Sequence, residues 1–387
     1  MAVERDRQGT GRTALVLTGG GARAAYQVGV LMAIAHLSPQ RQQNPFPILC
    51  GTSAGAINAA GLACLADDFG KATAVLARIW RRMRAADIYR ADALGIGLTG
   101  ARWLSALAFG WLLHRAPRSF LDNAPLRELL NQHLDFAGIR RAIDCGALHA
   151  VSVSASGYDS GENISFFQGH ADAHPWRRTQ RLGIASELTV EHLMASSAIP
   201  FVFPAVHLHR EYFGDGSMRQ LAPISPAIHL GAERILIIGA GRAREAISRQ
   251  TSEGYPSLAQ IAGHTLSSIF LDSLAVDIER VQRINQTLSK IPPAMREAAG
   301  IKLRPIETLV IAPSQRLDSI AAEYAHTLPT PVKILLTGLG AMNRRGGALT
   351  SYLLFEKPYI RHLIKLGYDD ALARREEITA FLGYERR

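Results

Sequence analysis

The chain has 387 residues, 48% of them hydrophobic and 20% charged, so it can bury a sizeable core and is not intrinsically disordered. Three scattered cysteines without a C-x-x-C pair exclude a disulfide framework and a cysteine-based zinc or redox motif. The net charge of +10 comes almost entirely from arginine, which suits attraction to phosphate groups, although a general arginine bias gives the same composition.

Neither the N-terminus nor any internal run predicts a membrane span. The first 13 residues are polar and charged and lack the apolar core of a secretory signal peptide. The most apolar stretch, Ala93–Leu113, contains Arg102 and several glycines. We interpret it as a buried or interfacial segment and not as a spanning helix. We therefore expect a cytoplasmic protein that can contact a membrane peripherally.

The N-terminal part alternates between strands and helices. Strands are predicted at Ala14–Leu17 and Phe46–Cys50, and each runs into a glycine-containing turn. Helices are predicted at Ala22–Leu37 and Ala56–Ala66. A repeated order of strand, turn and helix is typical of an α/β fold with a parallel sheet.

The remaining chain continues this mixture of elements. In order, we expect a basic helix at Asp68–Arg84, a helix at Pro125–Leu134, strands at His149–Ser156 and Asn163–Gln168, a helix at Val190–Ser197, a hairpin at Ala205–Phe213, a strand at Arg234–Ile238, a helical stretch at Ser257–Ile291 and a strand at Thr308–Ile311. The chain after Asp318 is predicted to be mostly helical, with Tyr352, Phe355 and Tyr359 packed in a core.

These elements predict one catalytic domain with two appendages. Residues 1–12 form a polar tail, residues 13–315 the catalytic domain, and residues 316–387 a helical C-terminal region packed on it. The proline-rich stretch Pro292–Pro305 is the only plausible linker, and the strand that follows it should rejoin the same sheet.

A serine lies between the second strand and its helix. Gly51-Thr52-Ser53-Ala54-Gly55 has the G-x-S-x-G spacing in which a serine occupies a sharp turn with its hydroxyl exposed above the sheet. The helix N-terminus beneath it favours negative charge as a tetrahedral intermediate forms. We interpret Ser53 as a nucleophile; the alternative is a tight turn with a capping serine.

A glycine run follows the first strand. Gly19, Gly20 and Gly21, followed by Ala22 and Arg23, can expose backbone N–H groups of the kind that an oxyanion hole requires. The spacing also fits a dinucleotide-binding fingerprint, but the acidic residue that this fingerprint needs about 20 positions later is absent. A Walker phosphate loop is excluded because no Gly-Lys-Ser/Thr follows.

The base that activates Ser53 is less obvious from the sequence. None of the 13 histidines has a recognisable catalytic setting, although His207 and His209 could supply a triad. Asp215 lies between two glycines at the end of the predicted hairpin, a pattern that is also an ordinary turn.

Taken together, these motifs resemble the patatin-like phospholipase family. The glycine run Gly19–Arg23, the Gly51–Gly55 turn and the Asp215-Gly216 pair occur in the family's order, and Ala195–Pro204 is similar to the S-x-A-x-P-x-x-F-P run before its aspartate. Ser217 follows where the family usually has glycine or alanine. The resemblance covers roughly residues 13–240.

The resemblance implies a fold and a chemistry. The fold would be a three-layer α/β/α arrangement around a mostly parallel sheet. The reaction would be acyl-ester hydrolysis of phospholipids or related lipids, with Ser53 as nucleophile, Asp215 as general base and no histidine. The oxyanion hole would come from the N–H groups around Gly20, Gly21 and Ala22, with Arg23 beside it. No cofactor or metal is implied.

Two alternatives to this function stay open. A Ser-His-Asp α/β-hydrolase would have the same nucleophile elbow, which is the sharp turn between strand and helix that carries the serine. In that fold, however, the elbow normally follows more than two strands. A catalytically silent lipid-binding or membrane-associated protein could share the fold, although the intact serine, aspartate and glycine loop argue against it.

Three further patterns bear on the binding of metals, nucleic acids or membranes. His170 and His174 have metal-ligand spacing, but Gly169 and Pro175 flank them and make a helix unfavourable, so no metal site is predicted. No nucleic-acid-binding fold is recognisable.

The basic helix carries arginines beside Trp80 and precedes Ala93–Leu113, a combination that suits docking on an anionic membrane. The alternative is a solvated charged face. The four arginines are Arg78, Arg81, Arg82 and Arg84.

Overall fold

The computed structural model describes residues 12–90, 119–241, 261, 263–265, 268, 273–301, 303–338, 340–341 and 347–384. The segment Ala93–Leu113, with the interpretation given above, lies outside these residues. Among the described residues, no helix is both long and apolar enough to cross a bilayer.

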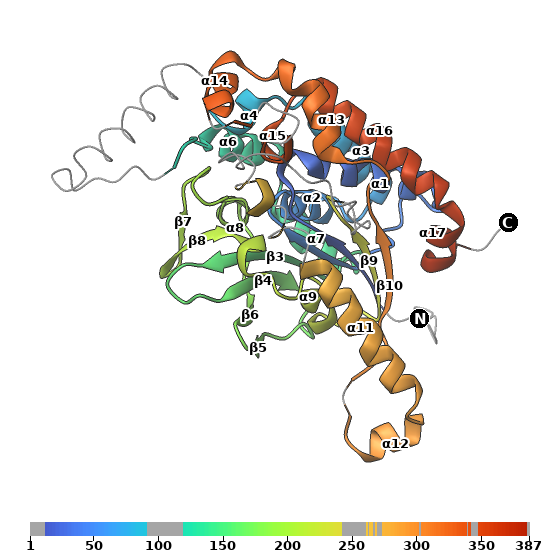
Figure 1. The fold of residues 1–387 in the computed structure, drawn as a ribbon. Helices are drawn as coiled ribbons and strands as arrows, with labels where there is room; N and C mark the ends of the chain where they lie inside the picture. The colour runs from blue at the N-terminus through green and yellow to red at the C-terminus, as the bar shows by residue number, and fades with distance from the viewer. Residues whose placement is uncertain are drawn as a thin grey trace, which may run out of the picture.

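A mixed, mostly parallel sheet forms the centre of the molecule (Figure 1). Its order is β10-β9-β1-β2-β3-β4-β6-β5, with β8 paired to β3 and β7 to β8. The strands are β1 (Thr13–Leu17), β2 (Ile48–Thr52), β3 (Ala150–Gly157), β4 (Asn163–Gly169), β5 (Trp176–Arg178), β6 (Arg181–Ala185), β7 (Val206–Leu208), β8 (Glu211–Asp215), β9 (Arg234–Ile238) and β10 (Glu307–Ile311).

The five strands from β10 to β3 run parallel to one another, as the strand–turn–helix order predicts. Connections between parallel strands must cross over the sheet, and the helices make these crossings. The helices before β9 are η1 (Gly21–Ala24), α1 (Ala25–Leu37), α2 (Ala54–Ala63), α3 (Phe69–Arg82), α4 (Ala85–Ile88), α6 (Ala124–His133), α7 (Ala137–Asp144), α8 (Val190–Ser196), η2 (Gly216–Arg219) and α9 (Ser225–His229).

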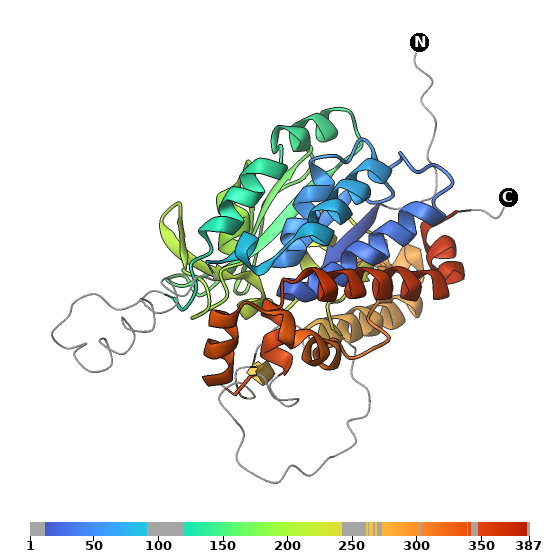
Figure 2. The same ribbon diagram turned by 90° about the horizontal axis from the view of Figure 1, so that it is seen from above.

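The C-terminal part adds mainly helices. They are α11 (Ser273–Ser289), α12 (Pro293–Ala298), α13 (Leu317–Tyr324), η4 (Ala325–Thr327), α14 (Thr330–Gly338), α15 (Gly347–Leu353), α16 (Lys357–Ala373) and α17 (Arg375–Leu382). The strand β10 pairs with β9, as expected for a strand that rejoins the sheet. Figure 2 shows α16, coloured red, lying alongside α1, coloured blue.

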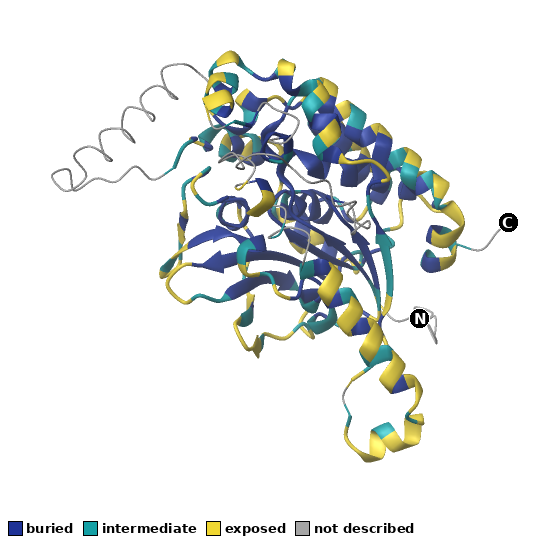
Figure 3. Ribbon diagram, in the orientation of Figure 1, coloured by how far each residue is buried: buried dark blue, intermediate teal, exposed yellow. Residues whose placement is uncertain are grey.

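The central strands are buried (Figure 3), and their residues contribute to two separate core clusters. In β1, Leu15 and Leu17 pack into the cluster under α1 and α2, whereas Ala14 and Val16 pack into the second cluster on the opposite face. The second cluster includes residues of α9 and α11. Because both faces are covered, the central strands β1, β2, β3 and β9 are buried along nearly their whole length. The result is three layers of helix, sheet and helix.

Several local details differ from the expectations. The helix predicted from Ala22 begins as the 3-10 turn η1 before it becomes α1. The edge strands β5 and β6 and the helices α7 and α9 were not anticipated. Tyr352, Phe355 and Tyr359 are buried as expected, but they come from α15, the turn after it and α16, because Pro358 starts a new helix.

Candidate active site

Ser53 occupies a strained turn at the carboxyl end of β2. Its backbone has φ 55° and ψ −130°, a left-handed φ that is uncommon outside glycine. Two N–H groups of the first turn of α2, those of Ala56 and Ile57, donate to its carbonyl oxygen at 2.9 and 3.3 Å. Only 2% of Ser53 is exposed. Gly51 lies in β2 and Gly55 in the first turn of α2, so the strand and the helix come closer to Ser53 than the sequence predicted.

Ser196, the last residue of α8, holds the backbone of Ser53 in place. The N–H of Ser53 donates to Oγ of Ser196 at 2.8 Å. The Ser196 hydroxyl in turn donates to the carbonyl of Ser154 in β3 at 2.6 Å. Ser196 is fully buried, so this bridge fixes the turn to the neighbouring strand without water.

The strand register brings Asp215 next to Ser53 although 161 positions separate them. Thr52, the residue before Ser53, pairs with Ser154 in β3. Ala155, the next residue of β3, pairs with Asp215 at the end of β8. A Cβ on Gly216 would lie 2.0 Å from the carbonyl oxygen of Ser154 and 3.0 Å from Cγ2 of Thr52, so only glycine allows this approach.

Burial controls the electrostatics of Asp215, which is 1% exposed. Burial raises its pKa to about 6, and hydrogen bonding to the Ser53 hydroxyl and to Ser217 offsets part of the rise. Oδ1 accepts the N–H of Ser217 at 2.9 Å. Oδ2 is buried and makes no hydrogen bond of regular geometry. A carboxylate with a pKa near 6 can accept a proton at neutral pH.

The glycine run forms a tight turn after β1. Gly21 has φ +53°, and a Cβ there would lie 2.3 Å from the carbonyl oxygen of Tyr352 in α15. The N–H of Arg23 donates to the carbonyl of Gly20 at 3.1 Å, which closes the turn. Within the described part of the chain, the N–H groups of Gly20 and Gly21 donate to no backbone or side-chain acceptor. The turn runs from Gly19 through Gly20, Gly21 and Ala22 to Arg23.

The Arg23 side chain connects this turn to the C-terminal region. The guanidinium is 4% exposed and donates to Oγ of Ser351 at 2.7 Å and to the Tyr352 hydroxyl at 3.3 Å. It also lies over the Tyr352 ring, 4.1 Å from the centroid. Arg23 is therefore at the glycine turn as the motif predicts, and its side chain anchors α15.

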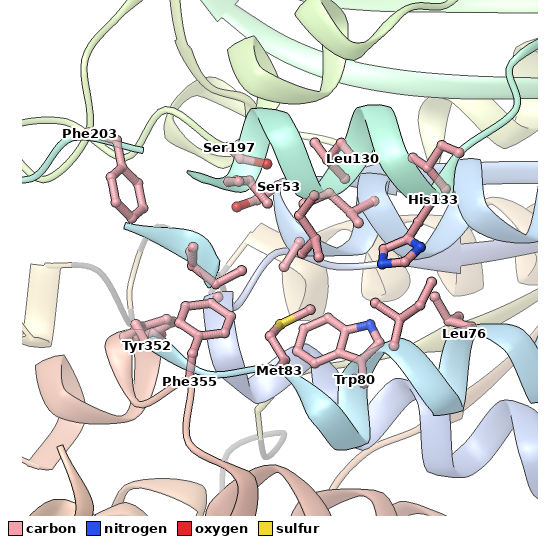
Figure 4. A pocket seen from close by; sticks show the side chains of 18 of the residues that line it. Ser53, Leu76, Trp80, Met83, Leu130, His133, Ser197, Phe203, Tyr352 and Phe355 are labelled. Carbon is pink, nitrogen blue, oxygen red and sulfur yellow. The ribbon is translucent and has the colours of Figure 1, made fainter. Parts of the chain in front are cut away.

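An apolar pocket opens beside Ser53 (Figure 4). Helices α2, α3, α4, α6 and α15 supply most of its wall, and the cavity volume is about 50 Å³. Trp80 and Phe355 stack at 6.3 Å between ring centroids on one side. The lining includes Gly21, Ser53, Ile57, Leu76, Trp80, Met83, Leu126, Leu130, His133, Ser197, Ile199, Phe203, Tyr352 and Phe355. An apolar lining of this kind suits a hydrocarbon chain.

The pocket could not be predicted from the sequence, because its walls come from six separate segments of the chain. Gln27 supports the glycine turn by donating to the carbonyl of Thr18 at 2.8 Å, and Asn58 bonds Gln27 at 2.9 Å. The Trp80 indole donates to Asn58 at 2.8 Å and so fixes its own place in the pocket wall. Amide side chains inside apolar helices were the one signal in the sequence that could have indicated this network.

One histidine, His133, lies in the pocket wall. Among the described residues, no histidine side chain hydrogen bonds to Ser53 or Asp215. His207 is exposed in β7, and His209 lies in the turn between β7 and β8, where it contacts the Phe166 ring. His192 caps the start of α8 through Thr189, and burial lowers its pKa to about 4.

A small polar cluster lies at the opposite edge of the sheet. His149 precedes β3, His170 follows β4, and both lie close to Asp172. Arg12 donates to Oδ2 of Asp172 at 2.9 Å and lies 3.2 Å from Nε2 of His149. His174 is not part of the cluster, so the predicted i, i+4 histidine pair does not converge.

Comparisons with known proteins point to one protein family. The sequence profile of the patatin-like phospholipase family matches residues 15–228. A curated protein from Pseudomonas aeruginosa (strain BWHPSA011 / Pa011), "cGAMP-activated phospholipase", is 29% identical over 218 residues, which are 54% of this chain and 53% of that protein. The chain thus matches about half the length of this relative.

A solved structure, VipD from Legionella pneumophila, aligns over 95% of this chain and 67% of its own, with a TM-score of 0.34 and 13% identity. The family profile covers more than half of the chain, from β1 into α9. It spans the glycine turn, the Ser53 elbow and the Asp215 loop. The chain belongs to the patatin-like phospholipase family.

Proposed function

We propose that this protein is a serine lipid acyl hydrolase that cleaves fatty acyl esters of phospholipids or related lipids. The observation that carries the proposal is the register that places the buried Asp215 against Ser53, at the mouth of an apolar pocket. The family membership supports a lipid substrate.

The proposed reaction uses two residues in turn. Asp215 takes the proton from the Ser53 hydroxyl as Oγ attacks the ester carbonyl and forms a tetrahedral oxyanion. Collapse breaks the bond to the alcohol, which leaves with the proton from Asp215, and an acyl-enzyme remains. Water then attacks the acyl-enzyme and gives a proton to Asp215. As this second tetrahedral intermediate collapses, Asp215 returns the proton to Oγ of Ser53 and the fatty acid departs.

The oxyanion needs donors that are already in place. The N–H groups of Gly20 and Gly21 are unpaired in the described structure, and that of Ala22 follows them in the same turn. Donors fixed before the reaction cost no reorganisation when charge develops, and a single such donor contributes roughly 3–4 kcal/mol. We assign these three groups to the oxyanion hole.

We assign the catalytic domain to residues 13–315 and treat residues 316–387 as a helical region that completes the site. Tyr352 and Phe355 form part of the pocket wall, and the Arg23 contacts join α15 to the glycine turn. This region therefore helps to shape the acyl-binding surface.

We also propose that α3 contributes to membrane contact. Arg78, Arg81, Arg82 and Arg84, at the end of this helix and just beyond it, are all exposed, whereas Trp80 and Met83 face the pocket. Exposed guanidinium groups beside the pocket wall suit anionic lipid headgroups.

The test is the release of free fatty acid from phospholipid vesicles. The wild-type chain should release fatty acid in proportion to enzyme and time, and Ser53→Ala, with an unchanged melting temperature, should not. Equal release by both proteins would contradict the proposal. Binding without release by the wild type would favour a silent lipid-binding protein of the same fold.

A further inference from the structure

Large apolar side chains are exposed on β8 and on the turns and loops next to the Ser53–Asp215 site. We define the apolar rim as four residues, namely Tyr158, Phe201, Tyr212 and Leu221. Their exposed fractions are 47%, 71%, 49% and 59%, respectively. Exposed apolar side chains that come together around one site mark an interaction surface more often than single scattered ones do.

Tyr158 lies beside Asp215, and the other rim residues lie on segments that contact the site. Tyr158 lies near enough to Asp215 to have its pKa raised by that carboxylate, after burial, which is the larger cause. Its N–H donates to the carbonyl of Tyr212 at 2.9 Å. Leu221 follows Gln220, whose amide donates to Oγ1 of Thr52, next to Ser53, at 2.7 Å.

Phe201 lies in the loop that supplies Ile199 and Phe203 to the pocket wall. Its φ of +64° is a rare conformation for a bulky residue and costs free energy. Two hydrogen bonds hold the loop in this shape: the N–H of Phe120 donates to the carbonyl of Phe201 at 2.7 Å, and the N–H of Leu121 to that of Val202 at 2.9 Å. The fold thus keeps an aromatic ring pointing outward at a cost in stability.

We propose that the apolar rim inserts into a lipid surface and seats the mouth of the Ser53 pocket on the bilayer. Two tyrosines, a phenylalanine and a leucine match the apolar bodies and polar tips that settle at the boundary of headgroups and acyl chains. The exposed Arg219 lies in the same loop as Leu221 and suits lipid phosphate.

The inference rests on the proposed function, because a lipid hydrolase must draw its substrate out of a bilayer into the pocket. It differs from the role proposed for the α3 arginines in its driving force. Apolar insertion persists on uncharged bilayers and at high salt, whereas attraction between arginines and anionic lipid is screened.

The experiment measures co-sedimentation with phosphatidylcholine vesicles at high salt. All proteins carry Ser53→Ala, so that binding is measured without turnover. The rim variant adds Phe201→Asn and Leu221→Gln; asparagine tolerates the left-handed backbone of residue 201. The matched control adds Met295→Ser in α12, which removes an apolar side chain that is 63% exposed and lies far from the site (Figure 1).

The rim variant should bind these vesicles roughly ten- to a hundredfold more weakly than the Ser53→Ala parent, and the control should bind like the parent. Equal binding by rim variant and parent would overturn the proposal. A change in oligomeric state of the rim variant in lipid-free light scattering would also overturn it, because a second copy of the chain would then cover the rim.

Insertion can also be seen directly. Tryptophan at position 201 (Phe201→Trp) should be quenched by brominated phosphatidylcholine beyond the quenching of the parent, and Met295→Trp should not. No added quenching at 201 would overturn insertion. Fatty acid release by proteins with Ser53 intact is measured separately. If binding depends on the rim but no fatty acid is released, the hydrolase proposal is contradicted. If fatty acid is released but binding does not depend on the rim, only the docking proposal is contradicted.

Discussion

The hydroxyl of Ser196 accepts the backbone N–H of Ser53 at 2.8 Å and so supports a backbone with a positive φ. Strained conformations of this kind persist only where their surroundings determine them fully. The N–H that Ser196 binds belongs to the residue whose hydroxyl faces Asp215. The position of the proposed nucleophile therefore depends on a residue of α8.

Replacing Ser196 with alanine should lower kcat on a short soluble ester by roughly 10- to 100-fold, because a small displacement of a positioned nucleophile is costly. KM should change little, since the pocket wall is untouched. Steady-state kinetics check both values.

Ser152→Ala is the matched control for Ser196→Ala. Ser152 is another buried serine of the sheet, and its hydroxyl has no hydrogen-bond partner in the described structure. Full activity in Ser196→Ala, or an equal loss in Ser152→Ala, would show that the bridge to Ser53 has no special role.

Asp215→Asn should reduce ester hydrolysis at least about a hundredfold with the fold retained, because the amide cannot accept the proton of Ser53. Single substitutions of His207 and His209 by glutamine should cost little. Collapse of activity in either histidine variant, with normal melting, would restore the triad that the sequence left open.

The pH dependence follows from the raised pKa of Asp215, about 6. The base is ionised above this pH and protonated below it. The kcat/KM of the wild type on a soluble ester should therefore rise about tenfold per pH unit below 6 and level off above it. A profile that stays flat down to pH 4 would be inconsistent with Asp215 as the base.

The same pKa predicts a cost in stability. A carboxyl whose folded pKa lies above its unfolded value of 3.8 contributes stability that is fully present below pH 3.8 and is lost as the pH rises through about 6. At pH 7 the buried carboxylate thus costs about 3 kcal/mol. Asp215→Asn should melt higher than wild type at pH 7, with a gap that narrows toward pH 4. A lower melting temperature at pH 7 would contradict this.

The sequence pointed to the residues of the proposed site but not to the residues that surround them. Ser53 and the glycine turn could be found because each is a local motif between a strand and a helix, and Asp215 because its motif follows in the family's order. Ser196 and the Arg23 contact with α15 could not, because each depends on packing between segments more than 140 positions apart. The edge strand Trp176–Arg178 was missed since three residues with two arginines carry no strand pattern.

The proposed membrane role of the α3 arginines predicts a salt-dependent loss. Changing Arg78, Arg82 and Arg84 to glutamine should weaken binding to anionic vesicles by roughly 3 kcal/mol, more than a hundredfold, at moderate salt. Neutral vesicles should not distinguish the two proteins. Vesicle co-sedimentation across a salt series measures this, with a short-ester assay as the control for folding. Identical binding curves at every salt concentration would mean that the arginines form a solvated face.

The most direct test of the account is covalent labelling with a fluorophosphonate, followed by mass spectrometry of the labelled peptide. The account predicts one label per chain, on Ser53, with none in Ser53→Ala and at least about a hundredfold slower labelling in Asp215→Asn. Labelling at another residue, or an undiminished rate in Asp215→Asn, would contradict a Ser53 nucleophile activated by Asp215.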